Sequence, residues 1–492
     1  MSASGHTRTV RAPADGSVVG EVRHATTDDV APTVAESKAA FEDWRRTSPH
    51  DRAAILTRAG NKLDGLSDQL GALHARESGK VIAQARNEVK GAGFLLQENA
   101  HVGRFDAGYL APTGALPGGE RDMTVVERVP LGVVVCVIPF NFPVELTIEK
   151  AAAALAAGNT VIVKPPPQNP LATIAVVDEL NASGLPLGVL TALPGDTDVS
   201  AALCAAPDVD AVSLTGSVGA GLAVASSTAQ LLRPLHLELG GNGAAIVLED
   251  ADLDLVVSET LRGRMLMNGQ ACASTKRLVV HRSVVDEVQG QLKAALTQVV
   301  VGDPTDEASQ VGPLIDPASA RRVADQVERA IAQGATRIHG PTEAEGSWFG
   351  PTLLGSVPAT ADVAIDDEIF GPVVTIIPFD DELEATRIVN ASRLALTAAV
   401  FSEDWPRAIS VAQQLDVGGV VVNGTNNYRP PVVPFGGVAL AGTGREGIGY
   451  AYEDLTRTRF IALRGFRPAG FTVPTRATDG SGRRNEMAHV HA

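Results

Sequence analysis

Cysteine, long apolar runs and basic charge are all scarce in this sequence. Its three cysteines, Cys136, Cys204 and Cys272, show no pairing pattern and no metal-ligand spacing, which predicts no metal site and suits a reducing, cytoplasmic compartment. The longest apolar run, 131–140, is well below the roughly 18 residues that a membrane helix needs, and residues 1–11 lack the apolar core of a secretion signal. The net charge is −16, so we expect neither a nucleic acid nor a membrane as partner.

The composition that remains is that of a globular enzyme. The chain has 492 residues, of which 45% are hydrophobic and 20% charged. This length is too great for one hydrophobic core, and it predicts roughly two to four domains or lobes.

Residues 24–100 are expected to be mostly helical, because apolar residues recur there three and four positions apart. The expected helices are 28–45, 49–63 and 66–77. Gly79 suits a helix end. A linker rich in proline and glycine follows at 112–120, and then a short strand candidate at 123–127.

From residue 133 the pattern changes to alternating strands and helices. The strand candidates are 133–138, 160–163, 189–193 and 211–214, and the helix candidates between them are 145–157, 173–181 and 199–205. A second block, 244–432, has strand candidates at 278–281, 373–377, 398–401 and 420–423. The alternation predicts an α/β fold with a parallel, doubly wound sheet and ligands at the carboxyl ends of its strands.

Two short segments carry the chemistry. Glu238 lies in His-Leu-Glu-Leu-Gly-Gly-Asn and Cys272 lies in Asn-Gly-Gln-Ala-Cys-Ala, 34 residues later. A carboxylate that activates water and a thiol that forms a covalent adduct are suited to two-step acyl chemistry. A solvated carboxylate and a buried, inert cysteine are the alternative interpretations, but Glu238 lies between two leucines, where a charge is costly without a role or a partner.

A third segment, Pro139-Phe140-Asn141-Phe142-Pro143, ends the first strand of the α/β region. The side-chain amide of Asn141 is a donor at a loop tip, and the alternative is a turn-forming asparagine beside proline.

These three segments, in this order and spacing, resemble the aldehyde dehydrogenase superfamily over nearly the whole chain. The resemblance implies two doubly wound Rossmann-like domains plus a small β oligomerisation arm. The implied domains are a cofactor-binding domain at 1–116 and 131–239, a catalytic domain at 240–440, an arm at 117–130 and 441–466, and a flexible tail at 467–492. Strands near residue 123 and at 457–463 would form the arm and pair subunits into a homodimer or homotetramer; a surface edge strand is the alternative for both.

The resemblance also implies the reaction. Cys272 would attack an aldehyde to give a thiohemiacetal, whose oxyanion is held by Asn141 and the Cys272 backbone N–H. Hydride transfer to NAD or NADP would leave a thioester, and Glu238 would activate the water that hydrolyses it. Enzymes of the family that acylate CoA generally lack this glutamate, so hydrolysis is favoured over CoA transfer; the third possibility is a catalytically silent binding homologue.

The cofactor residues follow from the same resemblance, because no G-x-G-x-x-G follows a strand here. Ser217, in a Thr-Gly-Ser turn that opens a helix, would contact the pyrophosphate. Lys164 would hold the adenosine ribose, Gly195 would lie on the adenine side, and Glu368 and Phe370 of Glu-Ile-Phe-Gly-Pro would hold the nicotinamide side. The remaining implied contacts are Val137, Ile138, Pro139, Phe140 and Leu239.

One position departs from the family pattern. Where members that prefer NAD carry a glutamate that bonds the ribose 2′-OH, this chain has Pro167. Proline does not repel a 2′-phosphate and Lys164 attracts it. We therefore expect NADP to be accepted.

The substrate pocket is expected around Phe142, Glu149, Ala271 and Arg429. Semialdehyde enzymes of the family often carry arginine where Glu149 stands. Either Arg429 receives an anionic substrate, or Glu149 and Arg429 pair and shape the tunnel, which we favour slightly. Medium aliphatic or aromatic aldehydes and semialdehydes all remain open.

Overall fold

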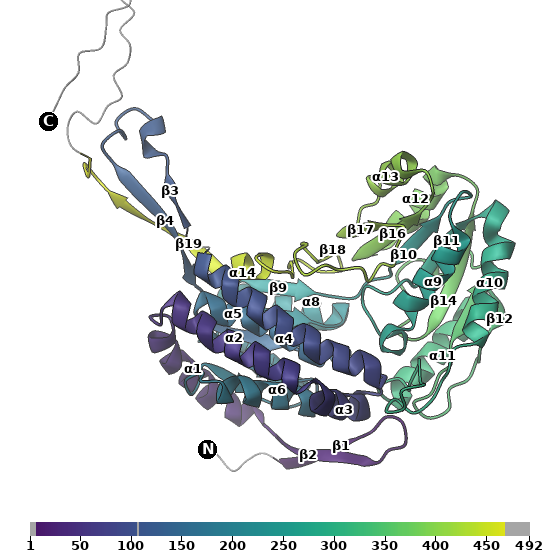
Figure 1. The fold of residues 1–492 in the computed structure, drawn as a ribbon, viewed down its shortest axis with the longest axis horizontal. Coiled ribbons are helices and arrows are strands. Elements are labelled where there is room, and N and C mark those ends of the chain that lie inside the picture. Colours follow the sequence, from purple (N-terminus) through teal and green to yellow (C-terminus); the bar gives the residue numbers. More distant parts are fainter. Residues whose placement is uncertain (1–5, 106–107, 468–492) are drawn as a thin grey trace, which may run out of the picture. The chain divides into compact units, whose positions relative to one another are not determined.

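The computed structural model describes residues 6–105 and 108–467 (Figure 1). They form two compact units, one of residues 6–105 with 130–457 and one of residues 108–129 with 458–467. The larger unit contains two open α/β sheets, and the smaller one contains most of a three-stranded sheet. The prediction that residues 468–492 form a flexible tail lies outside the described residues.

The first sheet of the larger unit has five parallel strands in the order β7-β6-β5-β8-β9. They are β5 (Val133–Val137), β6 (Thr160–Lys164), β7 (Leu190–Ala192), β8 (Ala211–Thr215) and β9 (Leu235–Glu238). Chain order runs outward from β5 in both directions, so a topological switch point lies between β5 and β8, where such folds bind ligands. The predicted doubly wound parallel sheet is confirmed.

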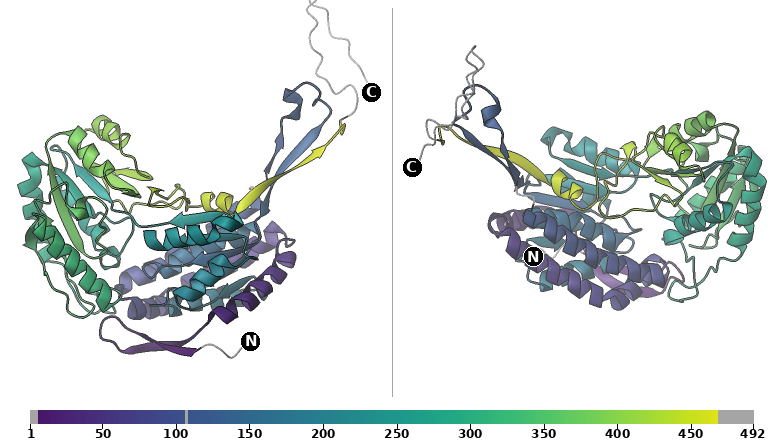
Figure 2. Two further views of the ribbon diagram at one scale, coloured as in Figure 1. Left: turned by 180° about the vertical axis from the view of Figure 1, so that it is seen from behind. Right: turned by 45° about the horizontal axis from the view of Figure 1, so that its top comes forward.

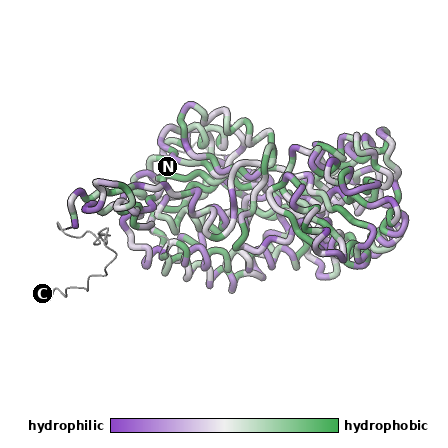
Figure 3. Tube along the Cα trace, turned by 90° about the horizontal axis from the view of Figure 1, so that it is seen from above, coloured by the Kyte–Doolittle hydropathy of each residue, from purple (hydrophilic) through white to green (hydrophobic). Residues whose placement is uncertain are grey.

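Alternate side chains of these strands enter two separate cores. Val134 and Cys136 join one core with the helices that follow β5 and β6, whereas Val133 and Val135 join another core on the opposite face. Successive residues of a strand point to opposite faces, so a run of β-branched residues is buried on both sides. Figure 3 colours the chain by hydropathy and shows hydrophobic and hydrophilic stretches interspersed along the trace.

Helices cover both faces of the first sheet (Figure 2). One core contains residues of α2 (Pro49–Gly65), α4 (Ile82–Phe105), α5 (Pro143–Ala157) and α6 (Leu171–Ala182). The other contains residues of α1 (Val30–Trp44), α7 (Thr197–Ala205) and α8 (Val218–Thr228). Between α2 and α4 lies α3 (Ser67–Ser78), and it ends at Gly79, whose φ of 78° suits the expected helix end. A hairpin of β1 (His6–Arg11) and β2 (Val18–His24) precedes α1 and had no predicted counterpart.

The second sheet has seven strands in the order β12-β13-β14-β11-β10-β16-β17. They are β10 (Ala244–Val247), β11 (Arg277–His281), β12 (Thr336–His339), β13 (Thr352–Gly355), β14 (Val373–Phe379), β16 (Thr397–Phe401) and β17 (Gly419–Val422). All pair in parallel except β12 with β13. One face packs on α11 (Pro317–Ala332), α12 (Glu382–Asn390) and α13 (Trp405–Ala412), and the other on α9 (Leu253–Arg264) and α10 (Val285–Thr297).

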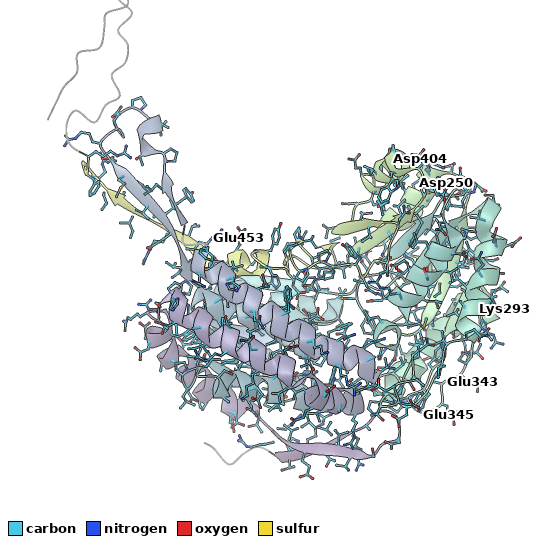
Figure 4. All side chains as sticks on the ribbon, viewed as in Figure 1. Asp250, Lys293, Glu343, Glu345, Asp404 and Glu453 are labelled. Atoms are coloured by element: carbon cyan, nitrogen blue, oxygen red, sulfur yellow. The ribbon has the colours of Figure 1, made fainter. Side chains whose placement is uncertain are left out.

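Side chains at the ends of β10 and β16 fasten α13. Asp250 accepts hydrogen bonds from the Ser402 hydroxyl and the Asp404 backbone N–H, and Asp404 in turn caps α13 by accepting from the Arg407 backbone N–H. Asp250 and Asp404 lie close together in Figure 4. These contacts belong to the scaffold, far along the chain from the Cys272 segment.

The remaining elements are short. β15 (Leu394–Ala395) pairs with β18 (Val438–Ala439), and α14 (Tyr450–Asp454) precedes the last strand. The three-stranded sheet has the order β19-β4-β3, with β3 (Gly108–Ala111), β4 (Met123–Pro130) and β19 (Thr456–Leu463). The two strand candidates near residue 123 and at 457–463 are therefore β4 and β19 of one sheet, with β19 at its edge and β4 in its middle. No helix in the described ranges is both long enough and apolar enough to cross a lipid bilayer.

Candidate active site

The segment before Cys272 has an unusual backbone. Met267, Asn268 and Gly269 have φ angles of 51°, 58° and 80°, and a run of left-handed residues is costly unless its surroundings hold it. The Asn268 side chain supplies part of that hold by donating to the backbone oxygens of Gly79 and Pro313, both at 2.8 Å. A Cβ at position 269 would lie 2.2 Å from the Gly371 carbonyl carbon, which accounts for the glycine in the Gly-Gln-x-Cys segment.

A buried lysine holds the chain at the nucleophile itself. The Lys276 ammonium donates to the backbone oxygens of Cys272 at 2.7 Å, Ala271 at 2.9 Å and Gly241 at 2.5 Å. It also forms an ion pair with Glu368 at 2.9 Å. One cation therefore joins three of the segments that the sequence analysis identified separately.

A buried arginine makes a second link between the same segments. The Arg264 guanidinium donates to the backbone oxygens of Gly269 at 3.2 Å, Ile369 at 2.8 Å and Val373 at 2.6 Å, and to the Ser274 hydroxyl at 2.6 Å. Burial lowers the pKa of the Arg264 guanidinium to about 9, and Glu368 opposes this effect. The loop that carries Cys272 and the Glu-Ile-Phe-Gly-Pro segment are thus one hydrogen-bonded unit.

Cys272 and Glu238 line the same cavity, whose volume is about 220 Å³. Glu238 ends β9, and its side chain is 2% exposed. Among the described residues neither carboxyl oxygen has a hydrogen-bond partner. Burial and the neighbouring Glu446 raise the pKa of Glu238 well above its usual value, so this carboxyl is poised to exchange a proton inside the cavity.

Asn141 is bound to the loop that carries the nucleophile. Its side-chain amide donates to the Gln270 backbone oxygen at 3.0 Å, and its side-chain oxygen accepts from the Phe142 backbone N–H at 3.1 Å. One N–H of the Asn141 amide is used in the first bond, and the second is left for another acceptor. The structure therefore brings together all three residues that were predicted to be catalytic.

The thiol of Cys272 is not activated in this state. Burial raises its pKa to about 11, and Lys276 opposes this rise while Glu368, Glu446 and Glu238 add to it. At neutral pH the sulfur is therefore protonated, and a base has to remove its proton before it acts as a nucleophile.

One wall of the cavity comes from α5, which begins at Pro143 directly after Phe142. Phe142 and Glu149 line the cavity together with Ala271 and Arg429. Arg429 forms an ion pair with Glu149 at 3.2 Å, and its guanidinium lies 4.1 Å from the centre of the Phe435 ring. The pairing that the sequence analysis slightly favoured is present in the structure.

Sequence reasoning missed two charged residues at this wall. Glu446 is buried, ion-paired with Arg429 at 3.1 Å, and accepts a hydrogen bond from the Lys150 ammonium at 2.9 Å. Burial opposes ionisation of Glu446, but Lys150 and Arg429 overcome it and lower its pKa to about 2. A lysine inside the Ala-rich helix α5 was the available signal, since a charge there needs a partner.

The residues predicted to bind the cofactor gather at the carboxyl ends of the first sheet. Val137 ends β5, Lys164 ends β6 and Ser217 caps α8 directly after β8, where its hydroxyl accepts from the Ala220 backbone N–H at 3.2 Å. The Ile138 backbone N–H donates to the Lys164 oxygen at 3.1 Å. Strand ends and a helix N-terminus at a switch point are suited to a dinucleotide.

Lys164 provides a test of that fit. Its side chain is 3% exposed, and among the described residues its ammonium donates to the Pro165 backbone oxygen at 3.0 Å. Burial lowers its pKa to about 8, and Asp196 opposes this effect. Because the Lys164 ammonium donates to the backbone oxygen of the next residue, it has further N–H groups available. These N–H groups could donate to the oxygens of a ribose or a phosphate. Pro167, which is partly exposed three residues later, contributes no charge.

The nicotinamide-side residues come from both sheets. Phe140 and Phe370 pack edge to face with ring centres 5.9 Å apart, and a Cβ at Gly240 would lie 2.4 Å from a Glu368 oxygen. Leu239, next to Glu238, donates its backbone N–H to the Ala441 oxygen at 2.9 Å.

The last two predicted contacts are Pro139 and Gly195. Pro139 is partly exposed after β5, and Gly195 lies just before α7, where a Cβ would meet Val199 at 2.7 Å. Within the described part of the chain, no group of His, Cys, Asp and Glu side chains is arranged to hold a metal ion.

Comparisons with known proteins identify relatives over nearly the whole chain. The family model of the aldehyde dehydrogenase family matches residues 1–461. The chain is 35% identical to a 3-sulfolactaldehyde dehydrogenase of Priestia aryabhattai, over 90% of this chain and 92% of that protein. It is 34% identical to a betaine aldehyde dehydrogenase of Rhizobium etli, over 91% and 92%.

A solved structure is similar to the same extent. The NADP-dependent glyceraldehyde-3-phosphate dehydrogenase from Bacillus halodurans, complexed with NADP, superposes with a TM-score of 0.90 at 33% identity, over 94% of this chain and 96% of that one. The predicted fold class is thereby confirmed. This chain belongs to the aldehyde dehydrogenase family.

Proposed function

We propose that this NAD(P)-dependent aldehyde dehydrogenase oxidises an aldehyde to the carboxylic acid through a thioester on Cys272, which water activated by Glu238 then hydrolyses. The observation that carries the proposal is that Cys272 and the unpartnered carboxyl of Glu238 line one cavity, with Asn141 bonded to the Cys272 loop.

The first half of the reaction uses the thiol. The Cys272 thiol first passes its proton to water. Its sulfur then bonds to the aldehyde carbon as the C=O π bond opens, and the second N–H of the Asn141 amide and the Cys272 backbone N–H stabilise the oxyanion. Removal of one such donor typically costs about 10²–10³ in rate. A bound nicotinamide would supply the acceptor for the hydride on this carbon, and loss of that hydride would convert the adduct into the thioester.

The second half uses Glu238. A water molecule adds to the thioester carbon while its proton passes to the Glu238 carboxylate, and the C–S bond then breaks to release the acid and restore Cys272. The position of Glu238 in a largely apolar cavity beside Cys272 supports hydrolysis over transfer to CoA, because this carboxyl has no hydrogen-bond partner among the described residues and is available to a water molecule.

Either NAD or NADP serves as cofactor in this proposal, and Pro167 supports acceptance of NADP. It places a neutral ring where a carboxylate would repel the 2′-phosphate, and Lys164 supplies a buried positive charge on the strand before it. Lys164, Ser217 and Glu368 would hold the adenosine ribose, the pyrophosphate and the nicotinamide ribose.

Substituting Glu238 separates the two halves of the reaction. In Glu238→Gln we expect one burst of NAD(P)H per active site and accumulation of an acyl adduct on Cys272, because only deacylation loses its base. Rapid-mixing absorbance and intact-protein mass spectrometry measure these outcomes, and Cys272→Ala, which should give neither burst nor adduct, is the control. Steady turnover by Cys272→Ala, or Glu238→Gln without an adduct, contradicts the proposal.

Product analysis distinguishes the alternatives. Formation of the free acid in the absence of CoA supports hydrolysis, whereas a strict requirement for CoA would assign the chain to the acylating enzymes. An absence of NAD(P)H formation with every aldehyde of a broad panel would indicate a binding homologue.

A further inference from the structure

The cavity beside Cys272 has an unbalanced set of charges. Four carboxylates line it, together with one guanidinium and mainly apolar side chains. The charged side chains are those of Glu145, Glu149, Glu238, Glu446 and Arg429. A substrate that enters the cavity meets these charges at low dielectric, where they are strong.

The guanidinium is already matched by anions. Arg429 forms ion pairs with Glu149 at 3.2 Å and with Glu446 at 3.1 Å, and it also packs against the Phe435 ring. Glu446 holds Lys150 as well. Arg429 is therefore poorly placed to attract a carboxylate, phosphate or sulfonate of a substrate, because it would have to leave two existing partners.

Two carboxyl groups remain without a cation. Glu238 is the base of the proposed reaction and is unpartnered among the described residues. The side chain of Glu145, in the first turn of α5, makes no hydrogen bond and no ion pair in the described ranges, while its backbone N–H donates to Glu88. Burial raises the pKa of Glu145 to about 7, although Arg429 opposes this effect. A positive group placed against Glu145 would offset the free-energy cost of burying its negative charge.

Two other roles for Glu145 fit the structure less well than binding of a cation: metal binding and a purely structural role. The described carboxylates do not form a group that could hold a metal ion. A purely structural role would be expected to show a hydrogen bond or an ion pair, as Glu149 does with the Gly447 backbone N–H at 2.7 Å.

We propose that the cavity selects aldehydes that carry a cationic ammonium group away from the aldehyde carbon, with Glu145 as the main counter-ion and Glu149 beside it. This substrate class rests on the proposed function, because it takes Cys272 as the point where the aldehyde carbon is held. The cavity volume of about 220 Å³ favours small molecules as substrates.

Three aldehydes of equal chain length test the proposal in the intact enzyme. They are butanal, 4-(trimethylammonio)butanal and 4-oxobutanoate, which are neutral, cationic and anionic. At constant ionic strength and saturating cofactor we expect kcat/KM for the cationic aldehyde to exceed that for butanal at least tenfold, with the anionic aldehyde the slowest. Equal values, or a preference for the anion, overturn the inference but leave the proposed function intact. Failure to oxidise all three, with oxidation of other aldehydes of a broad panel, also overturns the inference, whereas failure with every aldehyde of that panel overturns the proposed function.

A substitution assigns the preference to a residue. Glu145→Gln should lower kcat/KM for the cationic aldehyde about tenfold more than for butanal. Glu328→Gln, on the exposed side of α11, is the matched control and should leave the ratio of the two unchanged. A ratio that Glu145→Gln does not alter overturns the assignment to Glu145.

An inhibition experiment on the wild-type enzyme needs no variant. Tetramethylammonium chloride should compete with butanal, and sodium methanesulfonate at the same concentration should not. Equal inhibition by both salts would mean that the cavity does not distinguish the sign of charge, and would overturn the inference.

Discussion

Cys272 lies among groups that oppose its ionisation. Glu368, Glu446 and Glu238 all disfavour the thiolate, while Lys276, which favours it, pairs with Glu368 and donates hydrogen bonds to backbone oxygens. A thiol in this environment is protected from adventitious oxidation and is activated only when its proton is removed. The residues around the nucleophile therefore set the pH at which it reacts.

The raised pKa of Cys272 predicts a pH dependence for its alkylation. Below a pKa of about 11, the thiolate fraction rises tenfold with each pH unit. We expect the alkylation rate by iodoacetamide to rise about tenfold per unit between pH 7 and 9 and to continue rising beyond pH 9. Peptide mass spectrometry of Cys272 measures this rate, with free cysteine as reference and Cys272→Ala confirming the peptide. A plateau near pH 8.5, as for an ordinary thiol, would contradict it.

At the scale of elements, two buried glutamates hold the helices that follow β5 and β6. Glu88 of α4 accepts from the backbone N–H groups of Val144 and Glu145 at the start of α5, and Glu77 of α3 accepts from those of Leu171 and Ala172 at the start of α6. The carboxyl oxygens of both residues satisfy free N–H donors at the helix start, and the helix dipole also favours the negative charge of Glu88. The helix that forms one wall of the cavity is thus positioned by a carboxylate from α4.

Loss of the Glu88 charge should destabilise the protein in a pH-dependent way. Burial opposes ionisation of Glu88, but Lys80 and His74 outweigh it and lower its pKa to about 2. A depressed folded-state pKa contributes stability that is present above the unfolded-state value of about 4.5 and lost as pH falls toward 2. Glu88→Gln also leaves Lys80 buried without its partner, so we expect a loss of about 3–5 kcal/mol at pH 7.

Urea denaturation at several pH values checks this expectation. The difference in free energy of unfolding between wild type and Glu88→Gln should shrink as pH falls from 5 to 3. Glu36→Gln, exposed on α1, is the control and should change stability little at any pH. A difference that does not vary with pH would show that the effect is not due to the charge of Glu88.

The turn after β6 is the second element with a testable role. Replacing Pro167 with glutamate adds a carboxylate three residues after Lys164, where we propose that the 2′-phosphate binds. We expect the Kd for NADP to rise about tenfold or more, which is about 1.4 kcal/mol, with a smaller change for NAD. Titration calorimetry with both cofactors measures this, and Gln168→Glu, exposed on the same turn, tests whether any added charge suffices. An equal effect of Pro167→Glu on both cofactors would contradict the cofactor argument.

At the scale of the whole molecule, the strand β19 presents apolar side chains to solvent. Phe460 is 71% exposed and Ile461 45% exposed, and the sheet is kept together by polar contacts such as the ion pair of Arg459 with Glu127. Exposed apolar residues on an edge strand favour association with another chain. We propose that this sheet is the arm through which the enzyme forms a homo-oligomer.

Multi-angle light scattering with size-exclusion chromatography tests the arm. We expect the wild type to be a dimer or tetramer, and Phe460→Asp to shift it toward monomer. Leu383→Asp, at a side chain 64% exposed on α12, should leave the mass unchanged. A monomeric wild type, or equal effects of both substitutions, would contradict the proposal.

The domain limits drawn from the sequence remain a prediction.

The sequence alone determined the strands β5 to β8, the helices between them and the motif residues, because each depends on local pattern. It did not predict the β1–β2 hairpin or the helices of the second sheet. The β-branched run 133–137 predicted a strand, and Cys272, Glu238 and Asn141 were recognisable within a few neighbouring residues. Only the tertiary structure decided the electrostatics of the site. Glu446 meets Lys150 across 296 residues and Lys276 meets Glu368 across 92, and no periodicity encodes such meetings. Lys276 and Glu368 meet because they precede β11 and β14, which are neighbouring parallel strands and so begin at the same edge of the second sheet. Lys150 meets Glu446 because α5 packs on α14, which closely follows Glu446 in the chain.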